Sequence, residues 1–262
     1  MTSNNQEKKS SIDNPIEIVG NGKKIIVFIH HFGGTKDSWK WLTNKIDKDF
    51  RCILITLPGF GNTDRLKKIC MEEFAIFIND TIRSLNLNKY ILCGHSMGAK
   101  LALYAASLNK SHKPEKIILI APSPPTMEYM TKEEKDRMLI HPNITIATET
   151  VKKSTIKKLS KRKFNFAISS QLQVEEDTWK WWLETGMNKN IVTSISSLKI
   201  PSYVICSSKD PVIDMNVIYN YTIPYVYKPS IFILTSVGHL IPLEIPGKLA
   251  KHITRVINMT ET

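Results

Sequence analysis

Short apolar runs alternate with amphipathic stretches along the first half of the chain. The apolar runs occupy residues 24–29, 51–56, 90–93 and 116–120. The amphipathic stretches repeat apolar side chains every three or four positions, which predicts helices, and they occupy residues 38–48, 71–85 and 97–108. Strands that alternate with helices and are apolar on both faces are typical of a mainly parallel sheet flanked by helices. The pattern therefore predicts the α/β fold class.

This rhythm changes after residue 121, where Pro122, Pro124 and Pro125 interrupt regular structure. Residues 126–198 follow a helical pattern instead. In it, Thr131 and Glu134 have the spacing of a capping box at the start of one helix, and two further helices are predicted over 145–159 and 175–186. Apolar strand-like runs return at 202–206 and 230–234, and a helix over 248–257 closes the chain.

These changes predict an α/β core of residues 15–122 and 199–262, with a helical cap inserted at residues 123–198. An insertion that follows a strand end lies over the crevice in which α/β proteins bind their ligands. Residues 1–14 are polar, lack the apolar segment of a secretory signal, and are expected to form a flexible N-terminus. No apolar run approaches the roughly 20 residues that span a bilayer, so no membrane span is predicted.

The net charge bears on possible binding partners, and the cysteine content bears on the redox environment of the protein. The formal net charge is +12. Because no nucleic-acid-binding motif accompanies it, we interpret the charge as a basic surface and predict no specific nucleic-acid partner. The four cysteines lack CxxC spacing, and three lie in apolar strand-like runs, which favours free thiols in a reduced, cytoplasmic setting. Neither a metal-ligand spacing nor a dinucleotide fingerprint occurs, so no cofactor is predicted.

The sequence Gly94-His95-Ser96-Met97-Gly98 stands between a predicted strand and a predicted helix. A serine on so sharp a turn points its hydroxyl off the end of the sheet, and the two glycines keep the turn free of side chains. The following helix directs its N-terminal dipole and free N–H groups at the same point. This context favours a nucleophilic Ser96 over a plain glycine-rich turn.

A nucleophilic serine needs a base, and the base needs an orienting carboxylate. His239 follows the last predicted strand and Asp210 follows the strand before it, so both can reach the sheet edge that carries Ser96. The order serine, aspartate, histidine along the chain fits this arrangement. The competing acid, Asp214, precedes a helix and is interpreted as its N-cap. We therefore predict a catalytic triad of Ser96, Asp210 and His239.

Acyl transfer also needs N–H donors where negative charge develops on the substrate. The backbone of Met97, directly after the serine, is one predicted donor of this oxyanion hole. The other is assigned to Phe32, because the two glycines after it let the backbone turn inward. The alternative interpretation of this segment is a plain Gly-Gly turn.

Taken together, these motifs resemble the α/β-hydrolase superfamily, of the single-domain esterase and C–C hydrolase type with a helical cap. The resemblance covers residues 22–122 and 199–258. It rests on the segments 30–34 (HHFGG), 58–61 (PGFG), 94–99 (GHSMGA), 209–212 (KDPV) and 238–239 (GH). Family members usually have glycine where His31 stands, and often aspartate where Leu57 stands. His31 therefore adds a second imidazole near the expected pocket.

The triad and the resemblance imply a serine hydrolase that cleaves a carboxylic ester or thioester through an acyl-enzyme on Ser96. Fold and triad alone do not separate this activity from C–C bond hydrolysis or other non-ester chemistry. A third interpretation, of a different class, is a hydrolase-like receptor that binds a small molecule without turning it over.

The cap is expected to complete an apolar pocket for a small-molecule substrate with an apolar acyl portion. The predicted walls are His31, His95, Met127, Tyr129, Met130, Trp179 and Trp182. Within this set, His95 belongs to the serine turn and is expected to pack or to form a hydrogen bond rather than to act as the base.

A basic segment, residues 151–163, carries no acidic side chain. We interpret it as one solvated helix whose apolar residues Val151, Ile156 and Leu159 turn toward the protein. The alternative is that its lysines steer an anionic substrate toward the site.

Overall fold

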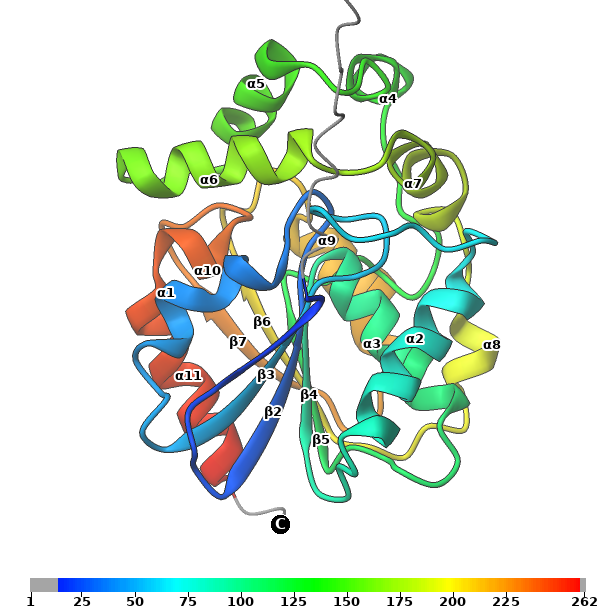
Figure 1. The fold of residues 1–262 in the computed structure, drawn as a ribbon, viewed down its shortest axis with the longest axis vertical. Coiled ribbons are helices and arrows are strands. Elements are labelled where there is room, and N and C mark those ends of the chain that lie inside the picture. The colour runs from blue at the N-terminus through cyan, green and yellow to red at the C-terminus, as the bar shows by residue number, and fades with distance from the viewer. Residues whose placement is uncertain (1–13, 260–262) are drawn as a thin grey trace, which may run out of the picture.

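Seven strands form one sheet at the centre of the computed structural model, which describes residues 14–259 (Figure 1). In chain order they are β1 (Ile16–Val19), β2 (Lys24–Ile29), β3 (Phe50–Ile55), β4 (Ile91–His95), β5 (Lys116–Ile120), β6 (Ser202–Ser207) and β7 (Ser230–Leu234). The spatial order is β1-β3-β2-β4-β5-β6-β7, and only the β1–β3 pair is antiparallel. The predicted α/β-hydrolase fold with a mainly parallel sheet is confirmed, and β1 is an edge strand that the apolar pattern did not indicate.

Helices cover both faces of this sheet (Figure 1). On one face lie α2 (Met71–Ser84), α3 (Met97–Leu108) and α8 (Val192–Ile195), and on the other α1 (Lys40–Thr43), α10 (Ile241–Glu244) and α11 (Pro246–Asn258). Alternate side chains of a strand point to opposite faces, so Val27 and Ile29 of β2 join one apolar core while Ile26 and Phe28 join the other. The parallel strands are therefore buried on both sides, as their continuous apolar sequence predicts.

Between β5 and β6 the chain forms a helical layer, which we call the upper helices (Figure 1). They are α4 (Lys132–Met138), α5 (Ile144–Ser154), α6 (Lys161–Leu172) and α7 (Glu176–Trp181), followed by the π-helical turn η2 (Trp182–Gly186). In the same view they lie above the end of the sheet where β4 passes into α3. Their division from the rest as a cap domain stays a prediction. Of the expected flexible N-terminus, residues 1–13 lie outside the described part.

The basic segment is not the single helix that we predicted. Helix α5 ends at Ser154, and the chain is irregular until α6 begins at Lys161. The backbone N–H groups of Ile156 and Lys157 donate instead to the Glu244 carboxylate, at 3.0 and 2.8 Å. This tertiary partner replaces the hydrogen bonds of a continued helix. As a result Val151 and Leu159 are buried as expected, whereas Ile156 is 49% exposed.

The helix predicted over 38–48 is also shorter and begins earlier. Thr35 caps a 3₁₀ turn, η1 (Lys36–Trp39), in a capping box with Ser38, and α1 then continues only to Thr43. The apolar residues that suggested a longer helix, including Ile46, are nevertheless buried. Their burial is achieved by a series of turns that leads into β3.

A second irregular helical stretch follows β6 and comprises α9 (Met215–Val217), η3 (Ile218–Thr222) and η4 (Ile223–Tyr225).

No helix within residues 14–259 is both long and apolar enough to cross a membrane.

Candidate active site

Ser96 occupies a strained turn between β4 and α3. Its φ of +53° and ψ of −119° lie outside the regions that L-residues ordinarily adopt. A Cβ on Gly94 would overlap the backbone of Gly98, and one on Gly98 would overlap the carbonyl oxygens of Ile29 and His30. The predicted reason for both glycines, a turn with no room for side chains, is therefore present in the structure. Strain of this kind is concentrated at functional sites.

A chain of hydrogen bonds connects the three residues of the predicted triad. His239 Nε2 lies 2.9 Å from Ser96 Oγ, and His239 Nδ1 lies 2.9 Å from Asp210 Oδ2. The other oxygen of Asp210 accepts from the backbone N–H groups of Val212 and Ile213, at 2.8 and 3.0 Å. These two bonds fix the carboxylate so that it can orient the imidazole. The residues come from the ends of β4, β6 and β7, which share one edge of the sheet.

Asp214 has a different environment from Asp210. Its Oδ1 accepts from the backbone N–H of Val217 at 2.9 Å, so it caps α9, as the sequence indicates. Burial lowers the pKa of His239, but the Asp210 carboxylate, together with the charges of Glu128 and Glu244, raises it, and the resulting pKa lies above its ordinary value. This pairing favours the protonated imidazole, the state that a base must reach when it accepts a proton.

His95 lies beneath the site rather than in it. Its Nε2 is 2.9 Å from the backbone carbonyl of His239, and because a carbonyl can only accept, this nitrogen is the donor. Burial holds the pKa of His95 well below 6.5, so the ring is neutral. His95 therefore anchors the loop that carries His239, in agreement with the hydrogen-bonding role expected for it and not with a place in the pocket.

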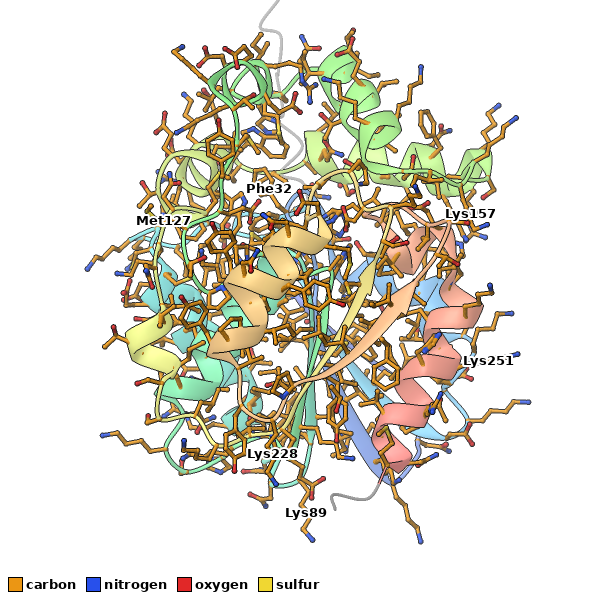
Figure 2. All side chains as sticks on the ribbon, turned by 180° about the vertical axis from the view of Figure 1, so that it is seen from behind. Phe32, Lys89, Met127, Lys157, Lys228 and Lys251 are labelled. Carbon is orange, nitrogen blue, oxygen red and sulfur yellow. The ribbon has the colours of Figure 1, made fainter. Side chains whose placement is uncertain are left out.

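The two predicted oxyanion donors come from different parts of the chain, the start of α3 and the loop after β2. Met97 is the first residue of α3, and the first N–H groups of a helix have no partner within it. Phe32 follows β2 in the loop that contains Gly33, whose φ of +77° suits glycine. Figure 2 shows Phe32 between the sheet and the upper helices, and its ring centroid is 4.2 Å from that of Trp179. Their role in binding an oxyanion stays a prediction.

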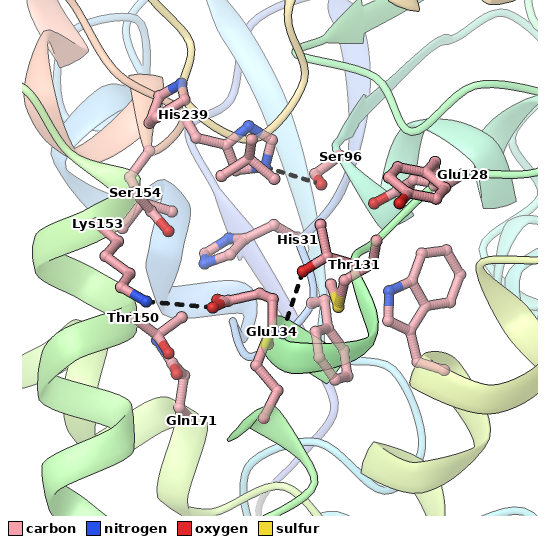
Figure 3. A pocket seen from close by; sticks show the side chains of 18 of the residues that line it. His31, Ser96, Glu128, Thr131, Glu134, Thr150, Lys153, Ser154, Gln171 and His239 are labelled. Atoms are coloured by element: carbon pink, nitrogen blue, oxygen red, sulfur yellow. Dashed lines mark hydrogen bonds and ion pairs between the residues drawn. The ribbon is translucent and has the colours of Figure 1, made fainter. Parts of the chain in front are cut away.

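A cavity of about 520 Å³ opens between Ser96 and the upper helices (Figure 3). Five of the predicted wall residues line it, namely His31, Tyr129, Met130, Trp179 and Trp182. The other two do not. His95 is buried below, and the Met127 side chain is 66% exposed on the outer surface. The prediction for Met127 is wrong because its side chain lies on the outer surface (Figure 2) and does not line the cavity.

Sequence analysis missed most of the polar residues that line this cavity. The polar residues along it include Glu128, Thr131, Glu134, Thr150, Lys153, Ser154 and Gln171. Figure 3 shows Glu128 on the same side as Ser96, with Lys153 and Gln171 on the opposite side. Lys153 Nζ pairs with Glu134 Oε2 at 3.2 Å, so one lysine of the basic segment reaches the cavity. Lys157 instead points outward from the protein surface (Figure 2).

Within residues 14–259, no three His, Cys, Asp or Glu side chains are grouped so that they would hold a metal ion.

Comparison with known proteins agrees with this architecture. The family model of the α/β hydrolase fold matches residues 24–143. A solved esterase from Exiguobacterium antarcticum superposes with a TM-score of 0.83 at 16% identity, covering 93% of this chain and 95% of that one. A meta-cleavage product hydrolase from Pseudomonas fluorescens gives a TM-score of 0.77 at 16% identity and covers 93% of both chains. At these identities the structural likeness concerns the fold.

Similarity to curated proteins is confined to shorter stretches. The protein PHYLLO of Arabidopsis thaliana is 28% identical over 141 residues, which are 48% of this chain and 8% of that protein. A putative 2-succinyl-6-hydroxy-2,4-cyclohexadiene-1-carboxylate synthase of Haemophilus influenzae is 34% identical over 82 residues, 31% of this chain and 33% of that protein. The chain thus spans a third or less of the length of these two relatives. The family match, the sheet order and the serine turn together show that the chain has the α/β-hydrolase fold.

Proposed function

We propose that the protein is a serine hydrolase that cleaves carboxylic esters or thioesters. The observation that carries this proposal is the hydrogen-bonded series Ser96, His239 and Asp210 at the floor of a cavity. A serine hydroxyl is a poor nucleophile until a base removes its proton, and a base works best when a third group fixes its orientation. Both conditions are met by distances of 2.9 Å.

In the proposed mechanism, Ser96 Oγ attacks the acyl carbon while His239 Nε2 accepts the serine proton. Asp210 stabilises the imidazolium, and the N–H groups of Met97 and Phe32 bind the oxygen that becomes negatively charged. The imidazolium then protonates the leaving alcohol or thiol as its bond to the acyl carbon breaks. A water molecule, deprotonated by His239, hydrolyses the acyl-enzyme and regenerates the serine.

The cavity supports a substrate of small to medium size with an apolar acyl portion. One side of it is apolar, with Phe32, Met130, Met138, Trp179 and Trp182. Pockets for small molecules are usually apolar with a few convergent polar groups. A volume of about 520 Å³ is in the range of such sites.

A fluorophosphonate probe tests the proposed nucleophile, because it phosphonylates activated serines and mimics the tetrahedral intermediate. We expect the wild-type protein to be labelled at a single site and Ser96→Ala to resist labelling. The control is Ser154→Ala, since Ser154 also lines the cavity. Its backbone carbonyl accepts from the His239 N–H at 2.8 Å, a bond that the substitution retains, whereas His239 Nε2 faces the Ser96 hydroxyl. Equal labelling of wild type and Ser96→Ala would show that the nucleophile is elsewhere.

The pH dependence of turnover provides an independent check on His239. We expect kcat/KM for a neutral ester to rise with pH, with a midpoint above the ordinary histidine pKa of about 6.5. Only neutral His239 accepts a proton, and the Asp210 carboxylate, acting against burial, raises its pKa. The inactive protonated form therefore persists to higher pH. Initial rates over roughly pH 5 to 9 measure this, and a midpoint below the ordinary value would contradict it.

C–C bond hydrolysis is the second candidate, supported by the structural likeness to a meta-cleavage product hydrolase. The same serine, base and oxyanion donors would act on a carbon leaving group in place of oxygen or sulfur. Product analysis with p-nitrophenyl esters beside β-diketones separates the two candidates. Turnover of diketones with no turnover of any ester would overturn the esterase proposal.

A further inference from the structure

A buried carboxyl group faces the cavity beside Ser96 and is not part of the proposed triad. Glu128 lines the cavity on the Ser96 side (Figure 3). Its Oε2 is buried, and the Ser123 hydroxyl is a hydrogen-bonding neighbour of the carboxylate. A carboxylate has about four lone-pair positions, whereas a serine hydroxyl offers a single O–H. The carboxylate therefore keeps acceptor capacity for a ligand in the cavity that it lines.

The Glu128 backbone is held firmly in place. Its N–H donates to the carbonyl of Met187 at 3.0 Å, which ties together the two ends of the chain segment that forms the upper helices. The same Met187 carbonyl accepts from Lys100 Nζ at 2.9 Å, and Lys100 also donates to the Thr126 carbonyl at 2.8 Å. Lys100 is fully buried in α3. Through these hydrogen bonds, Lys100 connects the segment around Glu128 to α3, the helix that follows Ser96.

Lys100 also balances the charge of Glu128, although its own hydrogen bonds go to the Thr126 and Met187 carbonyls. Burial raises the pKa of Glu128, whereas a hydrogen bond from Ser123 and the charge of the nearby Lys100 ammonium act in the opposite direction. Two of the Lys100 N–H donors are taken by carbonyl oxygens. The Glu134 carboxylate, which lines the same cavity, differs because Arg137 and Lys153 bind it directly. The Glu134 carboxylate is therefore paired with cationic side chains, whereas the Glu128 carboxylate can accept a hydrogen bond from a ligand.

Building on the esterase function proposed above, we propose that Glu128 is a specificity-determining residue that accepts a hydrogen bond from the substrate. The substrate class is an ester or thioester that carries a hydroxyl or N–H donor within a few bonds of the reacting carbonyl. A site built to bind such a donor rejects the analogue that lacks it, because the buried acceptor is then left unpaired. The apolar wall of Trp179 and Trp182 contacts the remainder of the molecule.

Two pairs of isosteric substrates test this proposal. On the acyl side the pair is p-nitrophenyl glycolate and p-nitrophenyl propionate, and on the leaving-group side it is S-(2-hydroxyethyl) thioacetate and S-propyl thioacetate. In each pair a hydroxyl replaces a methyl group. We expect wild type to prefer the hydroxylated member of at least one pair in kcat/KM by about tenfold or more. Glu128→Leu should reduce that preference at least tenfold, and Glu128→Gln, which keeps a carbonyl acceptor, by less.

The matched control is Glu133→Gln, an exposed carboxylate on α4 outside the cavity, for which the preference should not change. Affinities for the same pairs are also measured in Ser96→Ala and in Ser96→Ala with Glu128→Leu. A wild type that hydrolyses none of the four compounds contradicts the proposed esterase function, while the affinity ratios still report on Glu128. Ratios that are equal with and without Glu128, in both pairs, overturn its assignment as the specificity residue.

Discussion

Replacing Asp210 with asparagine should lower kcat for ester hydrolysis by about 10⁴-fold. The carboxylate now accepts a hydrogen bond from His239 Nδ1 at 2.9 Å, which fixes the tautomer with a free Nε2 facing Ser96. An asparagine amide can donate to Nδ1, and the proton then moves to Nε2, where it blocks acceptance of the serine proton. KM should change little, because Asp210 does not line the cavity.

Asp214→Asn provides the matched control for this prediction. Asp214 accepts the backbone N–H of Val217 as the N-cap of α9, and asparagine caps helices about as well as aspartate. We therefore expect kcat and stability to stay close to those of wild type. Steady-state rates of both variants on one p-nitrophenyl ester make the comparison. A large loss of kcat in Asp214→Asn, with little loss in Asp210→Asn, would reverse the two roles.

Loss of the Asp210 carboxylate should also change the pH profile. Burial lowers the pKa of His239 and the carboxylate raises it. Without the carboxylate, burial acts with less opposition, so the midpoint of any residual kcat/KM profile should move to lower pH. A merely structural role for Asp210 would reduce the amount of folded protein but would leave this midpoint unchanged.

The parallel strands of the core could be predicted because burial on both faces requires continuous apolar runs. Residues 24–29 and 116–120 match β2 and β5 residue for residue. Strand β1 has no such signature because it is an edge strand with two exposed residues, Glu17 and Ile18.

The basic segment was mispredicted for a different reason. Its helix stops where the distant Glu244 carboxylate binds the backbone, a tertiary contact that no local pattern encodes.

The candidate site shows the same difference between features set by local sequence patterns and features set by tertiary contacts. Ser96, Asp210 and His239 could be placed together because parallel strands bring their carboxyl ends to one edge of the sheet. The walls supplied by the upper helices could be predicted only in part, because helix periodicity does not say which face meets the core. Glu128 illustrates the difficulty, since it lies in an irregular segment between an exposed Met127 and an exposed Tyr129. Its inward position depends on Lys100, which is remote in sequence and buried against expectation for a lysine.

Gly98→Ala should destabilise the protein by about 2–3 kcal/mol and greatly reduce the yield of active enzyme. A methyl group at this position would overlap the carbonyl oxygens of Ile29 and His30, both of which belong to backbone that cannot rotate away. Relief requires α3 to move away from β2, and that movement displaces Ser96 from His239. The gain in helix propensity of alanine over glycine, about 1 kcal/mol, is smaller than this cost.

The matched substitution Gly247→Ala should change the free energy of unfolding in the opposite direction. Gly247 lies in the first turn of α11, and an added methyl group there meets no atom within 4 Å. Because its backbone is already helical, alanine should stabilise the protein by about 0.5–1 kcal/mol through the lower entropy of the unfolded chain. Urea titrations of both variants and wild type measure these differences from the transition midpoints at a common slope. Equal stability of Gly98→Ala and Gly247→Ala would mean that the serine turn tolerates a side chain at Gly98, and the close packing of α3 on β2 would then not be what holds Ser96 in place.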